Sequence, residues 1–251
     1  MDDKKILISL IVTVIITTLC GCSPAPMLQS PRVKTNISCG ISGMWDKHNG
    51  DGESCYDIRP LSLKFGFFDR VDVSGTYKPF NHYFKAGNIK IFIGEHGKPS
   101  LFKNVSYALF GGIKAFGSSF YDERNVYAGA IFATRQAFRK SEIELILQPS
   151  YFNMAYEWIG VRPEGRHPKS KADGMQINFG TIYTPYNSQR INLELTLGAM
   201  YRYTKNNEFK MYYNESQILV GKDLSLYNKW VIQGGAIINL KFKRERQGSV
   251  N

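Results

Sequence analysis

Apolar and polar residues alternate along most of the chain, with the two-residue period of a β-strand. The clearest run begins at Ile191, where Leu193, Leu195 and Leu197 alternate with mostly polar residues. The same period recurs near the C-terminus, in residues 228–242. The pattern predicts eleven strand segments, at residues 33–46, 56–68, 70–80, 86–95, 102–116, 123–135, 140–154, 174–185, 189–204, 209–222 and 228–242.

Many of these segments are longer than ordinary strands, which average about five or six residues. A tilted strand of about 9–11 residues spans a bilayer, and aromatic side chains mark both membrane interfaces of such barrels. Aromatic residues gather at the segment ends here, as at Tyr183, Tyr201 and Trp230. We therefore expect an all-β, antiparallel transmembrane β-barrel of ten to twelve strands. Twelve is favoured over eleven because bacterial single-chain barrels have even strand numbers.

The N-terminus has the pattern of an export signal, with two lysines followed by an apolar run at residues 6–19. That run is short for a membrane-spanning helix, although an uncleaved anchor helix is the alternative. The Leu-Cys-Gly-Cys sequence at 19–22 resembles the bacterial lipobox. The resemblance implies cleavage before Cys22 and lipidation of Cys22. The expected organisation is a signal peptide (1–21), a lipidated linker (22–32), the barrel (33–242) and a basic C-terminal tail (243–251).

The last predicted strand resembles the assembly signal of outer-membrane barrels, with Gln233, Gly235, Ile238 and Leu240 in its positions. Residues 22–242 as a whole resemble uncharacterised bacterial outer-membrane barrel lipoproteins. The resemblance implies an integral, lipid-anchored protein of the outer membrane with a periplasmic N-terminus. Its expected partners are outer-membrane lipid and the lipoprotein-sorting and barrel-assembly machinery. It implies no activity.

Composition and charge narrow the partners further. A mean hydropathy of −0.27 excludes a bundle of transmembrane helices. The net charge of +11 would suggest nucleic acid in a cytosolic protein, but the export signal directs it toward lipid phosphates and lipopolysaccharide. A predicted loop at residues 160–173 is basic, and a solvated loop is the alternative to a binding site. Its candidate lipopolysaccharide-binding residues are Arg162, Arg166, Lys169 and Lys171.

The polar faces of the strands carry both signs of charge, which either line a channel or pair and fill a small barrel. We therefore expect a structural barrel or a narrow passive pore, and an occluded lumen is favoured. The candidate lumen-lining residues are Lys64, Asp72, Lys90, Lys114, Arg135, Glu142, Glu144, Glu194 and Arg202.

Two other functions stay open. A barrel enzyme acting on lipid A or other envelope lipids would use outward histidines, here His48, His82 and His167. A lipid-anchored lipocalin-like barrel would account for the Gly-x-Trp sequence at 43–45. Export permits a disulfide between Cys39 and Cys55, with two separate thiols as the alternative. No metal-ligand spacing is present, and no cofactor is implied.

Overall fold

The computed structural model describes the chain from residue 28 onward. The described residues are 28–48, 51–78, 83–97, 104–117, 121–138, 141–158, 166–188, 190–213, 216–221 and 229–241. Within these ranges the regular structure is entirely β, and no helix there is long and apolar enough to cross a membrane. Residues 1–27, including Cys22 and the proposed signal peptide, lie outside the described part of the chain.

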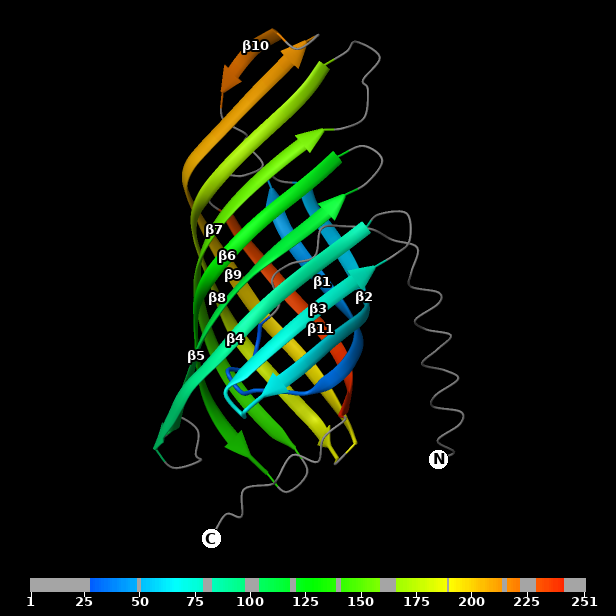
Figure 1. Ribbon diagram of the computed structural model, residues 1–251, viewed down its shortest axis with the longest axis vertical. Helices are drawn as coiled ribbons and strands as arrows, with labels where there is room; N and C mark the ends of the chain where they lie inside the picture. The colour runs from blue at the N-terminus through cyan, green and yellow to red at the C-terminus, as the bar shows by residue number, and fades with distance from the viewer. Residues whose placement is uncertain are drawn as a thin grey trace.

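The strands form one antiparallel sheet that closes on itself, because the first strand pairs with the last (Figure 1). Hydrogen bonds link Asn36–Asp46 to Val231–Lys241 and complete the barrel. The strands are β1 (Asn36–His48), β2 (Asp51–Phe67), β3 (Val71–Lys78), β4 (Tyr83–Gly97), β5 (Asn104–Gly117), β6 (Tyr121–Ala137), β7 (Glu142–Trp158), β8 (Arg166–Asn187), β9 (Ile191–Tyr213), β10 (Ser216–Gly221) and β11 (Lys229–Lys241).

These eleven strands occupy ten positions around the barrel. Both β10 and β11 pair with the same edge of β9, β11 along residues 191–202 and β10 along residues 209–213. The expectation of twelve strands is therefore not met, and ten, the lower end of the expected range, is found. The predicted segment at 209–222 is not one strand, because its first residues continue β9 and its last residues fold back as β10. Ten strands bring the start of β1 and the end of β11 to the same end of the barrel.

The strands end in short turns at one end of the barrel and extend much further at the other. At the short-turn end, Phe68 and Asp69 adopt positive φ values of 52° and 54° in the tight turn between β2 and β3. At the other end, which we call the tall end, β8 and β9 reach 22 and 23 residues, and β10 folds back on β9 (Figure 1). Short turns are periplasmic and long extensions extracellular in outer-membrane barrels.

The burial of side chains reverses the pattern of a water-soluble barrel. On β8 the inward residues Gln176 and Asn178 are only 4% and 0% exposed, whereas the outward neighbours Ile177 and Phe179 are exposed. Eight other strands present exposed apolar residues in the same way, among them Phe65, Phe67, Val73, Ile89, Ile91, Val105, Leu109, Ile113, Val126, Phe132, Leu147, Leu195, Leu197, Ile232 and Leu240. A lipocalin-like protein would need an apolar interior for its ligand, so this pattern counts against that alternative.

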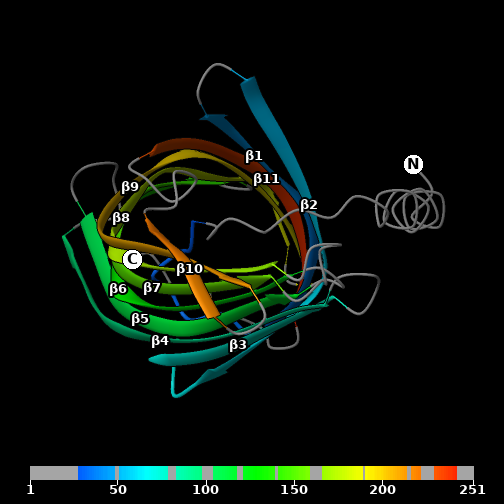
Figure 2. The ribbon, with the colours of Figure 1, turned by 90° about the horizontal axis from the view of Figure 1, so that it is seen from above.

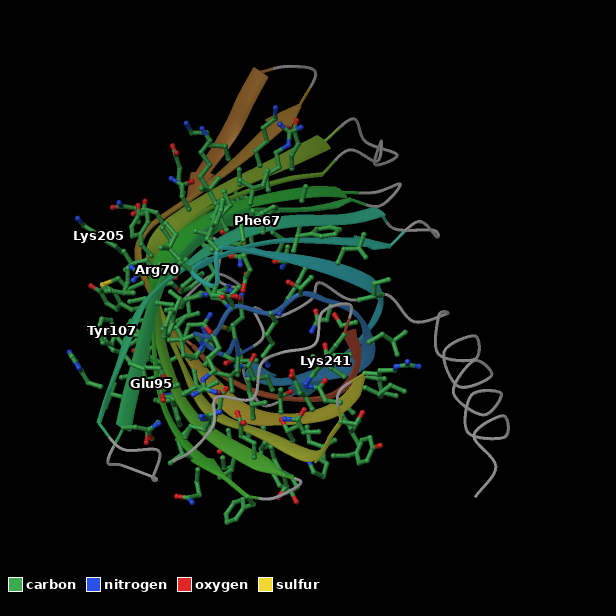
Figure 3. The ribbon with its side chains drawn as sticks, turned by 60° about the horizontal axis from the view of Figure 1, so that its bottom comes forward. Phe67, Arg70, Glu95, Tyr107, Lys205 and Lys241 are labelled. Atoms are coloured by element: carbon green, nitrogen blue, oxygen red, sulfur yellow. The ribbon has the colours of Figure 1, made fainter. Side chains whose placement is uncertain are left out.

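The exposed apolar surface has limits that can be followed along the strands. On β8 it extends from Met175 to Tyr186, and on β9 from Ile191 to Tyr203. These stretches of 12 and 13 residues are long enough for the roughly 9–11 residues with which a tilted strand crosses a bilayer. Beyond Tyr203, toward the tall end, Lys205 points away from the barrel into the surroundings (Figure 3). The outer wall thus carries an apolar band with a polar collar above it.

Candidate functional site in the lumen

Residues 28–35 lie inside the barrel, and we call them the closing segment (Figure 2). They run from within the lumen toward the short-turn end, where β1 begins. Leu28 contacts Gly180 and Gly198, each seven residues from the turn that joins β8 to β9. Thr35 contacts Gly66, next to the last residue of β2. Leu28, Ser30 and Pro31 are buried, so the segment packs closely against the inner wall at this level.

Lys90 of β4 holds the main chain of the closing segment. Its ammonium donates to the carbonyl oxygens of Ser30 and Arg32, at 2.8 and 2.6 Å. The third partner is the Asp72 carboxylate, 2.8 Å away on the neighbouring strand β3, where Asp72 is the register partner of Lys90. An ammonium has three N–H donors. Two of them bind the carbonyl oxygens, and the ion pair with Asp72 completes a site where both charged side chains are only 1% exposed.

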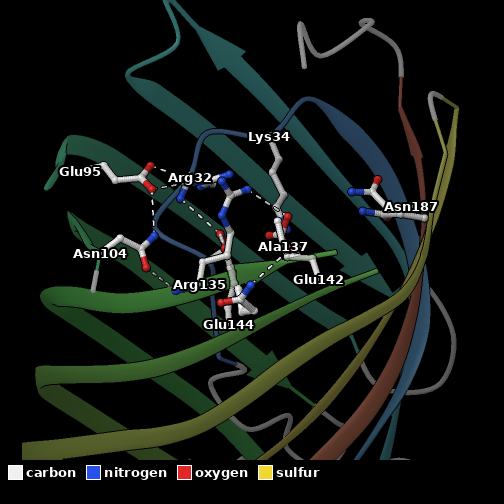
Figure 4. A network of polar contacts seen from close by, with 12 residues as sticks. Arg32, Lys34, Glu95, Asn104, Arg135, Ala137, Glu142, Glu144 and Asn187 are labelled. Carbon is white, nitrogen blue, oxygen red and sulfur yellow. Dashed lines mark hydrogen bonds and ion pairs between the residues drawn. The ribbon is translucent and has the colours of Figure 1, made fainter. Parts of the chain in front are cut away.

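Two cationic side chains of the closing segment pair with carboxylates on opposite parts of the wall (Figure 4). Arg32 Nη2 donates to both oxygens of Glu95, at 3.1 and 2.9 Å, and Lys34 Nζ lies 2.7 Å from Glu194 Oε1. Burial of the ammonium lowers the pKa of Lys34, whereas the carboxylates of Glu194 and Glu144 raise it by more. The pKa therefore lies above its ordinary value, and Lys34 stays charged at neutral pH.

Further carboxylates and amides continue this network along the wall. Ser30 Oγ donates to Glu144 Oε1 at 3.1 Å, and the backbone N–H of Gln29 donates to Gln148 Oε1 at 3.1 Å. The second oxygen of Glu144 is buried and has no hydrogen-bond partner. At Glu144 the wall therefore offers a buried acceptor that the closing segment does not use.

The wall is hollowed where the segment approaches it. A Cβ on Gly180 or Gly198 would lie 2.6 or 2.8 Å from Leu28 Cδ1, and a Cβ on Gly66 would lie 2.6 Å from Val33 Cγ1. Such distances are too short for a real Cβ. At Gly180 and Gly198 the backbone of the facing strand is closer still, since a Cβ on Gly198 would lie 2.5 Å from Phe179 O and one on Gly180 even nearer to Leu197 O, so the close pairing of β8 with β9 requires these glycines as well. Leu28 also belongs to an apolar cluster in the lumen, with Ala108, Phe110, Ile131, Ala133, Ile146 and Ile182.

Toward the tall end, the lumen is lined by neutral polar groups and a second apolar cluster. The cluster consists of Phe152, Met154 and Ala172, and the Arg202 guanidinium lies 5.1 Å from the centre of the Phe152 ring. Several buried polar atoms beside it have no hydrogen-bond partner, namely Asn125 Oδ1, Ser150 Oγ, Gln176 Oε1, Asn178 Nδ2 and Gln233 Oε1. Buried polar groups of this kind are ordinarily satisfied by ordered water.

The candidate lumen-lining residues all lie on the inner face, buried or half-buried. Asp72, Lys90, Glu144 and Glu194 surround the closing segment, and Glu142 pairs with Arg135 at 3.0 Å. Lys64, Lys114 and Arg202 are half-buried at other points of the wall. The charges that sequence analysis identified therefore come together, but mostly around a segment that it assigned to a linker. Residues 28–32 of that linker belong to the interior of the barrel.

Of the four candidate lipopolysaccharide-binding residues, the structure describes the side chains of two. Lys169 and Lys171 are exposed on the outer face of β8 at the tall end, and Lys169 lies 2.7 Å from Glu157. Arg166 begins β8, but its side chain is outside the described part, as is the whole of Arg162. His48 ends β1 and His167 lies in β8, both without described side chains, and His82 is outside the described residues. Their mutual geometry stays untested.

The strand register does not bring the two remaining cysteines together. Cys55 is the partner of Met44 in the pairing of β1 with β2, five residues along β1 from Cys39. Five residues of a strand correspond to about 17 Å, whereas disulfide-bonded Cα atoms lie within about 7 Å. Among the described residues, no group of three or more His, Cys, Asp or Glu side chains is arranged to hold a metal ion.

Comparison with known proteins identifies only distant structural neighbours. No family model and no curated protein matches the chain by sequence. The outer-membrane protease OmpT from Escherichia coli is 8% identical, with a TM-score of 0.46 over 86% of this chain and 97% of that one. The transport unit of the Escherichia coli autotransporter AIDA-I is 10% identical, with a TM-score of 0.34 over 92% and 97%. Ail from Yersinia pestis, in complex with the heparin analogue sucrose octasulfate, is 10% identical, with a TM-score of 0.30 over 83% and 97%.

These neighbours are bacterial outer-membrane β-barrels, and the barrel fold of this chain resembles theirs. At such scores the similarity carries no argument about activity, substrate or partner. The functional argument rests on the chain's own wall and lumen.

Proposed function

We propose that this protein is a lipid-anchored barrel of the bacterial outer membrane whose lumen is closed by its own N-terminal segment. Its role is that of a structural barrel, or of a narrow passive pore when the closing segment leaves. The observation that carries the proposal is the reversed burial of the wall. Charged and amide side chains face the lumen, while apolar side chains face outward on nine of the described strands.

The outward band supports insertion in a bilayer because exposing so much apolar surface to water would be unfavourable. Soluble monomers rarely present a contiguous apolar patch of more than a few hundred Å². Among the residues whose side chains are described, exposed apolar residues lie on nine strands around the circumference, far more than one patch. The tall end then faces outward from the cell, and the start of β1 faces the periplasm.

Occlusion is supported by the fit of the closing segment to the lumen. The segment is held through its main chain by Lys90, through its cations by Glu95 and Glu194, and through Leu28 by an apolar cluster. A lumen filled at this level passes no current unless the segment moves. We also propose that lipopolysaccharide phosphates contact Lys169 and Lys171, because both lie on the outer wall beyond the apolar band.

The decisive experiment is membrane fractionation of the full chain and of a Cys22→Ala variant, combined with a detergent gel run with and without heating. We expect both proteins to stay in the membrane fraction after carbonate washing, because the barrel itself is integral. Both should migrate faster when unheated. Release of the Cys22→Ala variant into the soluble fraction would contradict the integral barrel.

A further inference from the structure

The closing segment makes the contacts of a bound peptide rather than those of a barrel strand. None of its residues belongs to a strand, and its main chain is recognised by side chains of the wall. Lys90 binds two of its carbonyl oxygens, and Gln148 accepts from its Gln29 amide. Main-chain contacts of this type hold any extended peptide and do not depend on its side chains.

Side-chain contacts then select a peptide with a particular charge pattern. Arg32 and Lys34 are two residues apart, and they reach carboxylates that lie on β4 and β9. Glu144 adds a carboxylate whose second oxygen is buried without a partner, so the wall has acceptor capacity that the resident segment leaves unused. An apolar side chain is accommodated over the Gly180–Gly198 pair.

We propose that the lumen is a binding site for extended basic peptides, and that residues 28–35 are its resident occupant. This inference rests on the proposed barrel with its closing segment, and it adds the class of ligand. A matching peptide has an apolar residue, a cation four residues later and a second cation two residues after that. The resident segment competes with such a ligand because its tether gives it a high effective concentration.

The test uses the full chain in detergent and a fluorescein-labelled peptide with the sequence of residues 28–35. Reversing both cations of the resident segment, in the variant Arg32→Glu/Lys34→Glu, sets like charges against Glu95 and Glu194 and leaves the wall intact. We expect the labelled peptide to bind this variant at least about tenfold more tightly than the wild-type chain, measured by fluorescence anisotropy. If the variant loses its heat-modifiable migration, the milder Arg32→Gln/Lys34→Gln variant replaces it.

The wall carboxylates supply the specificity control. In the charge-reversed background, Glu95→Gln/Glu194→Gln should weaken peptide binding by about fivefold to tenfold, since each partly exposed ion pair contributes modestly. Glu157→Gln is the control, because Glu157 is exposed on the outer wall and pairs with Lys169 there, away from the closing segment. Changing the peptide instead of the wall should have the same effect. A peptide with glutamine in place of both cations should bind the charge-reversed variant as weakly as the original peptide binds the variant that also carries Glu95→Gln/Glu194→Gln.

Three outcomes would overturn the inference: no binding to a heat-modifiable variant, equal binding to variant and wild type, or binding indifferent to Glu95 and Glu194. Failure of the proposed membrane barrel is distinguishable from all three. In that case the wild-type chain itself would be soluble and would show no heat-modifiable form before any peptide is added.

Discussion

The inner and outer faces of the barrel wall use the same strands for opposite purposes. On β9, Asn192 and Glu194 face inward and are buried by protein, whereas Ile191, Leu195 and Leu197 face outward and are exposed. In a water-soluble protein the buried face would be the apolar one. The difference teaches that the apolar face of this wall is matched to lipid, and that the polar face needs partners from within the chain.

The inner face should respond most strongly to the loss of one of those partners. Replacing Asp72 by alanine leaves the Lys90 ammonium buried without its carboxylate, and breaking a buried pair costs about 3–5 kcal/mol. We expect the free energy of unfolding to fall by an amount near the lower end of that range, because Lys90 still donates to the carbonyl oxygens of Ser30 and Arg32. Urea unfolding in lipid vesicles, followed by tryptophan fluorescence, measures the change.

Ser74→Ala on the same strand is the matched control, since Ser74 is only half-buried and carries no charge. A loss below about 1 kcal/mol for Asp72→Ala, close to that of the control, would mean that water reaches Lys90 and compensates for the missing carboxylate.

A charged side chain introduced on the outer face should destabilise the barrel more, the deeper its position lies in the membrane. Leu197 lies midway along the apolar stretch of β9 and is 67% exposed, so a lysine there would face the bilayer centre. We expect Leu197→Lys to lower the free energy of unfolding by about 2–4 kcal/mol, and Ile191→Lys at the edge of the band by about 0–1 kcal/mol.

The same vesicle assay measures both variants, with Leu197→Met as the apolar control. Equal losses at Leu197 and Ile191 would contradict the assignment of the band to a bilayer. They would indicate a surface covered by protein instead.

The strand pattern was predictable from the sequence because most outward residues of the band are apolar and most buried inward residues are polar. Most strand positions therefore follow from local alternation alone. The start of β8 was missed by eight residues, since residues 166–173 are basic and polar like a loop. They stay extended because neighbouring strands supply partners, as Glu157 does for Lys169.

The closing segment could not be predicted in the same way. Its contacts join residues far apart in the chain, such as Lys34 with Glu194 and Arg32 with Glu95. No periodicity surrounds Pro31, and nothing local indicates which carboxylates of the wall it meets. The available signal was the pair of inward glycines, Gly180 and Gly198, which are adjacent in register and leave room for another segment.

The smallest expected effect concerns the polar collar of the outer wall, where Lys169 and Lys171 are exposed and are proposed to contact lipopolysaccharide. Lys169→Gln/Lys171→Gln should reduce the lipopolysaccharide that co-purifies with the protein by about threefold, because exposed charge contacts each contribute only a few tenths of a kcal/mol. The folded barrel should be unaffected, since both side chains are exposed. Arg70→Gln/Arg190→Gln is the matched control, because both residues are exposed at the short-turn end, which would face the periplasmic leaflet, away from lipopolysaccharide. If both variants lose equal amounts of co-purifying lipopolysaccharide, the positive charge of the whole chain, and not the collar, retains the lipid.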